Sequence, residues 1–83
     1  MDKILVEIWF PSLMKAFDMY IPVNTRFYMI AAMAQNAVAD ITGGKYVPSD
    51  NALLCDRLTG DCFDMNKTPR ESLLHNGSML YII

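Results

Sequence analysis

Apolar and polar residues alternate near the start of the chain with the two-residue period of a β-strand. Over residues 3–10 every second position is apolar: Ile4, Val6, Ile8 and Phe10. Over residues 17–21 a second set follows the same rule and is terminated by a proline: Phe17, Met19, Ile21, then Pro22. Because successive side chains of a strand point to opposite faces, each set should face one core. The two runs, joined by a turn that begins at Pro11-Ser12, predict an opening hairpin.

The period changes to that of a helix over residues 27–41. One stripe of apolar positions recurs at helical spacing: Phe27, Ile30, Ala31, Ala34, Val38 and Ile41. Asn24 or Thr25 can cap the start of this helix, and Gly43-Gly44 supplies the left-handed conformations that end it. We therefore expect one helix that packs its apolar stripe on the sheet.

Shorter signals follow in the second half of the chain. Pro48 and Asp50 break both periods, so residues 45–51 are expected to form a surface loop. Three further strands are predicted, all of them short: residues 52–56, 62–65 and 79–83.

The segment before the last strand carries a helix-start signal. Thr68 can be an N-cap, Pro69 suits the first helical position, and Glu71 can reach back to complete a capping box. A single helical turn should follow, with Leu73 and Leu74 covering the end of the core.

Length and composition favour one domain over residues 1–83, because 83 residues support one modest core. With 53% hydrophobic and 19% charged residues, the apolar share is high for so small a protein. Some apolar side chains must stay at the surface, which favours a protein partner or self-association. A net charge of −2, with 7 scattered basic residues, suits neither nucleic acid nor an acidic membrane surface.

No targeting or membrane-spanning signal is visible in the sequence. The first residues include Asp2 and Glu7 and lack the basic-then-apolar order of a secretory signal. The longest apolar segment, residues 27–41, is shorter than the roughly 20 residues that span a bilayer. We therefore expect a cytoplasmic protein with no direct membrane insertion.

Cys55 and Cys62 flank a predicted hairpin, and such a pair can form a disulfide or half of a metal site. A metal site is not expected, because His75 is the only histidine and the nearby aspartates lack the order of a calcium loop. Thr59-Gly60 suggests a type I turn with a glycine bulge, which would pair Cys55 with Phe63. The two thiols would then lie on opposite faces, so reduced cysteines are expected.

Catalysis is not expected from these residues. Nucleophilic catalysis needs a base and an orienting group that converge on a nucleophile, and the lone His75 lies in a predicted turn. An iron–sulfur cluster needs four cysteines, and this chain has 2. We expect no catalytic residue, no cofactor and no metal.

The predicted order of elements is strand, strand, helix, strand, strand, helical turn, strand. This order, with residues 68–83 as its ending, resembles the ubiquitin superfamily over essentially the whole chain. The resemblance implies an α+β, ubiquitin-like β-grasp fold: a mixed sheet of about five strands packed on one helix, with a short helical turn before the last strand.

Three phrases carry a narrower resemblance: residues 4–8 (Ile-Leu-Val-Glu-Ile), 54–60 (Leu-Cys-Asp-Arg-Leu-Thr-Gly) and 76–80 (Asn-Gly-Ser-Met-Leu). They resemble YukD-type proteins, small ubiquitin-like proteins that accompany type VII (ESX-like) secretion systems of Gram-positive bacteria. The resemblance implies a non-conjugated, cytoplasmic accessory or regulatory component of the secretion machinery. Its partners would be the secretion ATPase or membrane components of that system.

The strand pattern also indicates a candidate binding face. In ubiquitin-like folds the helix covers one face of the sheet, so residues that point away from it form an open face. Counting by twos along the strands gives the expected protein-binding residues: Leu5, Trp9, Tyr20, Leu54, Tyr81 and Ile83. By the resemblance, Leu54 falls where ubiquitin has the central isoleucine of its recognition patch. Trp and Tyr often anchor interfaces, whereas scattered exposed apolar residues are also normal. Met29 and Met33 lie off the helix stripe, as a second contact surface or as the border of the core.

Two other functions stay open at this point. A ubiquitin-like modifier or carrier acts through a mobile Gly-Gly carboxylate, whereas this sequence ends in the strand-like run of residues 79–83. A modifier or carrier role would therefore require processing or a partner. The other function is that of a self-assembling structural subunit, which would be a homo-oligomer.

Overall fold

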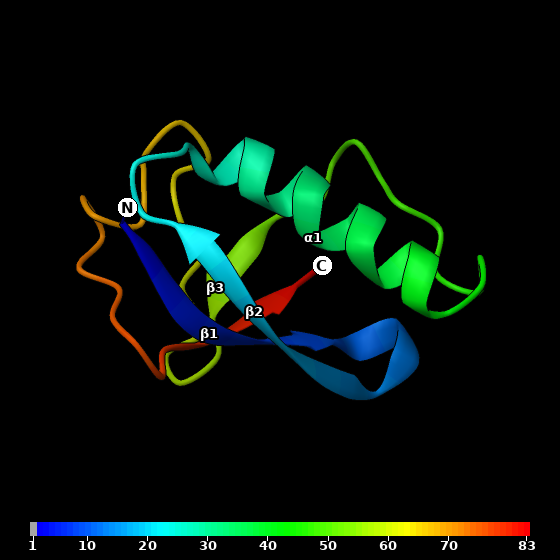
Figure 1. The fold of residues 1–83 in the computed structure, drawn as a ribbon. Helices are drawn as coiled ribbons and strands as arrows, with labels where there is room; N and C mark the ends of the chain where they lie inside the picture. Colours follow the sequence, from blue (N-terminus) through cyan, green and yellow to red (C-terminus); the bar gives the residue numbers. More distant parts are fainter. Residues whose placement is uncertain (1) are drawn as a thin grey trace.

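The opening hairpin and the helix lie where the residue pattern predicts them in the computed structural model, which describes residues 2–83. Strand β1 (Lys3–Phe10) pairs antiparallel with β2 (Lys15–Pro22), and the short 3-10 helix η1 (Pro11–Leu13) connects them. Helix α1 (Phe27–Ile41) lies across one face of the resulting sheet (Figure 1). The hairpin and the helix expected from the sequence are both confirmed.

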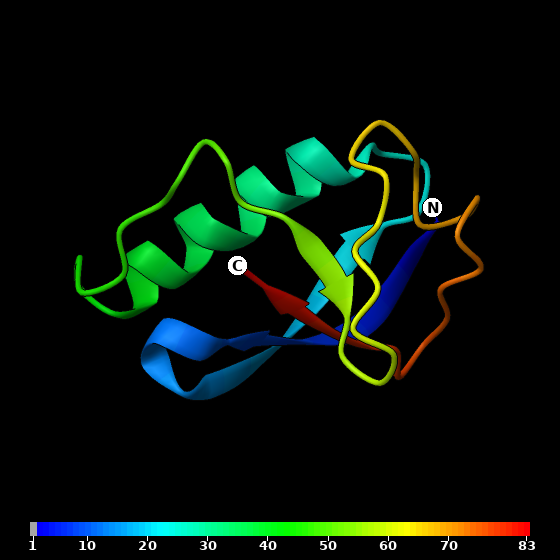
Figure 2. The ribbon, with the colours of Figure 1, turned by 180° about the vertical axis from the view of Figure 1, so that it is seen from behind.

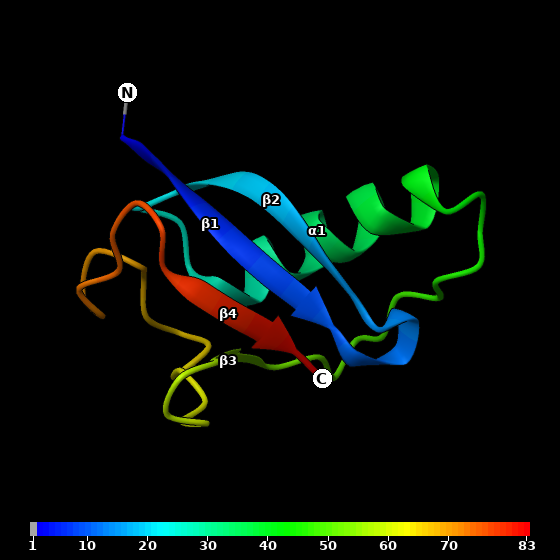
Figure 3. The same cartoon turned by 90° about the horizontal axis from the view of Figure 1, so that it is seen from below.

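Two shorter strands complete a mixed sheet. Strand β4 (Met79–Ile82) runs parallel to β1, and β3 (Leu54–Asp56) pairs antiparallel with β4. The strand order is β2-β1-β4-β3, and the four strands lie side by side in Figure 3. The strand expected at residues 62–65 is reduced to a single bridge between Cys55 and Cys62. The α+β, ubiquitin-like β-grasp architecture is confirmed, with four strands in place of about five.

The core forms between α1 and the sheet face that α1 covers. The sheet contributes alternate residues of every strand, and each of them is at most 3% exposed: Val6, Ile8, Phe10, Ile21, Leu54, Leu80 and Ile82. From the helix, the expected stripe is buried from Phe27 to Val38. Its last predicted member, Ile41, is 68% exposed, so that assignment is wrong. Ile41 is the final residue of α1, and its side chain is left largely open to solvent there.

Helix α1 begins without a side-chain cap, so the expected capping by Asn24 or Thr25 is wrong. The N-cap residue is Arg26, whose side chain makes no capping hydrogen bond. The first free backbone N–H groups of the helix donate to a later loop instead, from Phe27 to the Lys67 carbonyl (2.9 Å) and from Tyr28 to the Met65 carbonyl (3.1 Å). At the other end, Gly43 and Gly44 adopt φ angles of 65° and 88°, which confirms the predicted glycine stop.

Individual polar groups hold much of the second half of the chain. Gln35, only 2% exposed on α1, accepts hydrogen bonds at Oε1 from the Ser49 N–H (2.8 Å) and the Tyr46 hydroxyl (2.9 Å). Its Nε2 donates to the Ser49 carbonyl (3.0 Å). Burial raises the pKa of the Tyr46 phenol above its ordinary value of 10.0. One buried amide therefore fixes the loop that follows the helix.

The capping box is confirmed in its hydrogen bonds but closes a turn in place of a helix. The Thr68 N–H donates to Glu71 Oε1 (3.0 Å), and the Glu71 N–H donates to Thr68 Oγ1 (3.3 Å). Leu74 packs against the core as expected. Leu73 is 85% exposed with a φ of 58°, so its predicted core role is wrong. Figure 2 shows this irregular segment, in orange, passing around one end of the sheet.

Within residues 2–83, no helix has the length and apolar character needed to cross a membrane.

Candidate functional site: the outer sheet face

The outer sheet face is the side of the sheet that faces away from α1. Its members are the odd-numbered residues of β1 and β4 with the even-numbered residues of β2, because paired residues share a face. Leu5 lies opposite Tyr20, and Trp9 lies opposite Ala16 on one side and Tyr81 on the other. This face is turned toward the viewer in Figure 3.

Five of the six predicted binding residues are brought together here, at two ends of the face. Leu5 and Tyr20 form one apolar end, and their exposed fractions are 36% and 69%. Trp9 and Tyr81, both half-buried, form the other end. Ile83, 59% exposed, lies two residues beyond Tyr81 on the same side and so extends this second end.

Leu54 does not belong to this face, and its predicted placement is wrong. It is fully buried and pairs with Ile82, whose side chain also faces the helix. The exposed neighbour is Leu53, which is 39% exposed and exchanges two backbone hydrogen bonds with Ile83 (2.8 and 3.0 Å). A one-residue offset reverses every side chain of a strand, so sequence reasoning missed Leu53.

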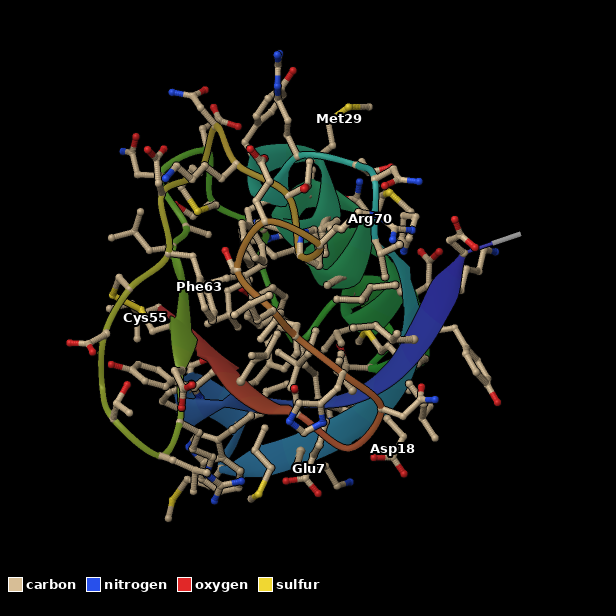
Figure 4. The ribbon with its side chains drawn as sticks, turned by 90° about the vertical axis from the view of Figure 1, so that its left-hand side faces the viewer. Glu7, Asp18, Met29, Cys55, Phe63 and Arg70 are labelled. Atoms are coloured by element: carbon tan, nitrogen blue, oxygen red, sulfur yellow. A yellow bond between two sulfur atoms is a disulfide. The ribbon has the colours of Figure 1, made fainter. Side chains whose placement is uncertain are left out.

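The prediction of reduced cysteines is also wrong. Cys55 and Cys62 form a disulfide, visible beside the Cys55 label in Figure 4, with their Cα atoms 3.8 Å apart. The hairpin between them has no glycine bulge that shifts the pairing. Asp56 Oδ1 accepts hydrogen bonds from the N–H groups of Leu58 (2.8 Å) and Thr59 (3.2 Å), and this loop sets Cys55 directly opposite Cys62.

This hairpin delivers Arg57 to the middle of the outer sheet face. Its Nη1 lies 3.1 Å from Glu7 Oε1, and its guanidinium carbon lies 4.7 Å from the centroid of the Trp9 ring. The Tyr81 hydroxyl donates to the Gly60 carbonyl of the same hairpin (3.4 Å). Each contact is individually weak at a solvated surface. Together they hold both aromatic rings in place, so a partner would meet rings that are already oriented.

A charged band separates the two apolar ends. Glu7 and Asp18 lie directly opposite each other on β1 and β2, and Figure 4 shows both on the side of the sheet away from α1. Met29 lies on the opposite side of the molecule, on the exposed surface of α1. Met29 and Met33 are 49% and 52% exposed, so they border solvent but cannot join the outer sheet face.

The side chains of the outer sheet face are of the kinds that make noncovalent contacts with a partner. It offers aromatic and aliphatic area, one guanidinium and carboxylates. Among residues 2–83, no three His, Cys, Asp or Glu side chains are grouped so that they could hold a metal ion. His75 lies in an exposed turn, where its Nδ1 is 2.9 Å from the Asn76 carbonyl oxygen.

Comparisons with known proteins identify the fold. Neither the models of protein families nor the curated proteins give a match to this sequence. Among solved structures, the ubiquitin-like domain of the Mycobacterium tuberculosis type VII secretion protein EccD1 matches with a TM-score of 0.76 and 9% identity, over 100% of this chain and 99% of that one. The EccD5 ubiquitin-like domain from Mycobacterium xenopi gives 0.81 and 12%, over 100% and 94%.

A chain of the MycP5-free ESX-5 inner membrane complex gives the same TM-score of 0.81 at 12% identity. The match extends over 100% of the present chain and 21% of that larger chain. At such identities the likenesses establish the ubiquitin-like fold.

Proposed function

We propose that this chain is a non-conjugated ubiquitin-like module that binds protein as an accessory or regulatory component of a bacterial type VII secretion system. Two independent likenesses support the proposal. The sequence phrases resemble YukD-type proteins, and the fold is similar to ubiquitin-like domains of the EccD1 and EccD5 proteins. The proposed role is binding, without catalysis, in the cytoplasm of a Gram-positive host.

The outer sheet face is the observation that carries the binding proposal. The core of this domain lies between α1 and the sheet face that α1 covers. The aromatic and aliphatic residues of the outer sheet face are not part of that core, and a domain of this size does not need them for it. Arg57 and the hairpin orient Trp9 and Tyr81, whereas Leu5 and Ile83 stay open to solvent. Oriented aromatic residues beside exposed aliphatic ones are typical of protein interfaces.

The proposed partner is a protein of the secretion machinery, either the secretion ATPase or a membrane component. One solved neighbour in fold belongs to the ESX-5 inner membrane complex, which supports a partner in an assembly of that kind. The same face could also pair with a second copy of the chain, so the oligomeric state must be measured alongside partner capture.

Affinity purification from the native host tests the proposal. The outer-face variant carries Leu5→Lys and Ile83→Lys, at positions that are 36% and 59% exposed. The matched control carries Tyr28→Lys and Met29→Lys on α1, where both residues are 49% exposed. Circular dichroism first establishes that all the proteins fold.

Recovery of secretion components by the wild type and the control, but not by the outer-face variant, is the expected result. Equal recovery by all three would refute the outer sheet face as the binding surface. Absence of secretion components from every sample would refute the proposed system, and concentration-dependent mass in solution would assign the face to self-assembly.

A further inference from the structure

The two edges of the sheet differ in how they are covered. β3 is flanked by the return of its own hairpin, because the Asp56 N–H donates to the Asp61 carbonyl (2.8 Å) and the Phe63 N–H donates to the Leu54 carbonyl (2.9 Å). β2 forms the opposite edge, and within residues 2–83 no segment pairs with its outer side. A long strand with an open edge is a template for an added strand.

The hydrogen bonds of β1 identify the open groups of β2. The Leu5 carbonyl accepts from the Gly77 N–H (2.8 Å) and the Glu7 N–H donates to the Ser78 carbonyl (3.0 Å), so odd-numbered residues of β1 bond toward β4. Even-numbered residues of β1 therefore bond toward β2, where their partners are odd-numbered. The backbone N–H and C=O groups that point away from β1, at the free edge of the sheet, are therefore those of Ala16, Asp18 and Tyr20.

An apolar groove runs beside this edge, between β2 and α1. It has a volume of about 200 Å³ and is lined on the strand side by Met19 and Ile21 and on the helix side by Ile30, Met33 and Ala37. An added strand would place alternate side chains on the helix side, opposite Met19 and Ile21. The groove therefore lies where two apolar side chains of an added strand would point.

The charge of Asp18 distinguishes between the strands that could pair with the edge, namely a second copy of β2 or a segment of another protein. Among the residues described, the ion pairs are Arg57 with Glu7 and Arg70 with Asp2, which leaves Asp18 without a cation although Glu7 lies opposite it. Antiparallel pairing of two β2 strands about their centre would bring Asp18 against Asp18, and like charges directly opposite are destabilising. A shift of two residues toward the end of β2 would place Pro22, which has no N–H, opposite Ala16 in a bonding position, and a shift toward its start would leave only Ala16 and Asp18 as a bonding pair within the strand. The edge therefore suits a strand that carries Lys or Arg opposite Asp18.

We propose that β2 binds an extended segment of another protein as an added strand, with apolar side chains in the β2–α1 groove and a basic side chain opposite Asp18. The backbone groups of the edge supply affinity, and the groove and Asp18 supply selectivity. The edge and the groove meet the outer sheet face only along β2, at Asp18 and Tyr20, and do not include Leu5, Trp9, Tyr81 or Ile83. Either surface can therefore fail while the other stands.

A synthetic peptide tests the proposal directly: Ser-Val-Thr-Val-Lys-Val-Thr-Val-Ser with blocked ends. Two forms of it are N-methylated at alternate backbone positions, one form at the Thr and Lys residues and the other at the Val residues. The proposed pairing is antiparallel, with Lys directly opposite Asp18, so the Thr and Lys N–H groups bond to the edge and the Val N–H groups point away. Methylation at Thr and Lys should weaken binding at least tenfold, whereas methylation at Val should leave it nearly unchanged. Equal affinities for both forms, or no binding of the unmodified peptide, would overturn the proposal.

A charge reversal at Asp18 provides a second test of the proposal. Asp18→Lys should weaken the Lys peptide and strengthen a matched Glu peptide, each by about three- to tenfold, consistent with cross-strand charge pairs. Hydrogen exchange at the Ala16, Asp18 and Tyr20 amides should slow on peptide binding. Protection that rises with protein concentration in the absence of peptide would show pairing of two copies and would overturn the proposal.

Discussion

The first half of the chain, through α1, and the second half, after it, are stabilised in different ways. β1, β2 and α1 bury apolar residues at regular intervals along each element. Residues 42–83 contain only two short strands, and a disulfide, a buried amide and side-chain turns hold the rest. Stability is therefore distributed in the first half and concentrated in a few groups in the second. Substitutions can test this difference, beginning with a residue that joins the halves.

Phe27→Ala should have the largest effect. Phe27 is fully buried on α1 and stacks on Phe63 of the second half, with ring centroids 4.7 Å apart. Truncation of such a residue leaves a cavity and should lower the free energy of unfolding by about 3–5 kcal/mol. Urea denaturation measures this loss of free energy of unfolding, and Tyr28→Ala, at an exposed position of α1, is the control. A loss below about 1 kcal/mol would contradict the assigned core.

Loss of the disulfide should be next. Closure of the short loop between Cys55 and Cys62 should contribute about 2–3 kcal/mol to the free energy of unfolding. Thermal unfolding with and without a reducing agent measures this contribution, and the Cys55→Ala/Cys62→Ala variant should not respond to the reducing agent. Hydrogen exchange should increase around Arg57 to Gly60 and little in β2. Uniform acceleration over both regions would show that the two halves do not differ in this way.

Gln35→Ala should lower the free energy of unfolding by about 1–3 kcal/mol, because it removes the three hydrogen bonds that this buried amide makes to Tyr46 and Ser49. The effect should be local, with faster hydrogen exchange at Ser49. Asn36→Ala, at the next and exposed position of α1, is the control. If the two variants unfold at the same urea concentration, the amide does not stabilise the loop.

Thr68→Ala and Glu71→Ala should have the smallest effects, each about 1 kcal/mol or less, because the reciprocal bonds are exposed to solvent. Since both residues act through one turn, the double variant should cost less than the sum of the single variants. A double-mutant cycle in urea measures this coupling. Strict additivity would contradict a reciprocal capping box.

The same difference explains which features of the fold the sequence predicts. Alternation over the eight residues of β1 assigns every side chain to the correct face. β3 has three residues within an apolar run, Ala52 to Cys55, so alternation there cannot distinguish Leu53 from Leu54. The carbonyls of Lys67 and Met65 in a later loop accept from the start of α1, and this distant contact cannot be predicted from the local capping signal at Asn24 or Thr25.

The candidate site was predictable where β1, β2 and β4 form it and not where the hairpin after β3 does. Leu5, Trp9, Tyr20 and Tyr81 follow from strand parity. Arg57, which lies over the Trp9 ring, belongs to the loop that the Asp56 side chain shapes, and the same loop aligns the two cysteines. A single Asx turn thus accounts for both the missed disulfide and the missed arginine.

Site-specific photocrosslinking in the native host tests the central claim, which is that the outer sheet face binds a protein. A photoactivatable phenylalanine replaces Ile83 on the outer sheet face in one strain and Tyr28 on α1 in the other, at positions that are 59% and 49% exposed. A discrete crosslink to a second protein from Ile83, with none from Tyr28, is the predicted result. A crosslink from Tyr28 and none from Ile83 would place the binding surface on the helix and contradict the claim.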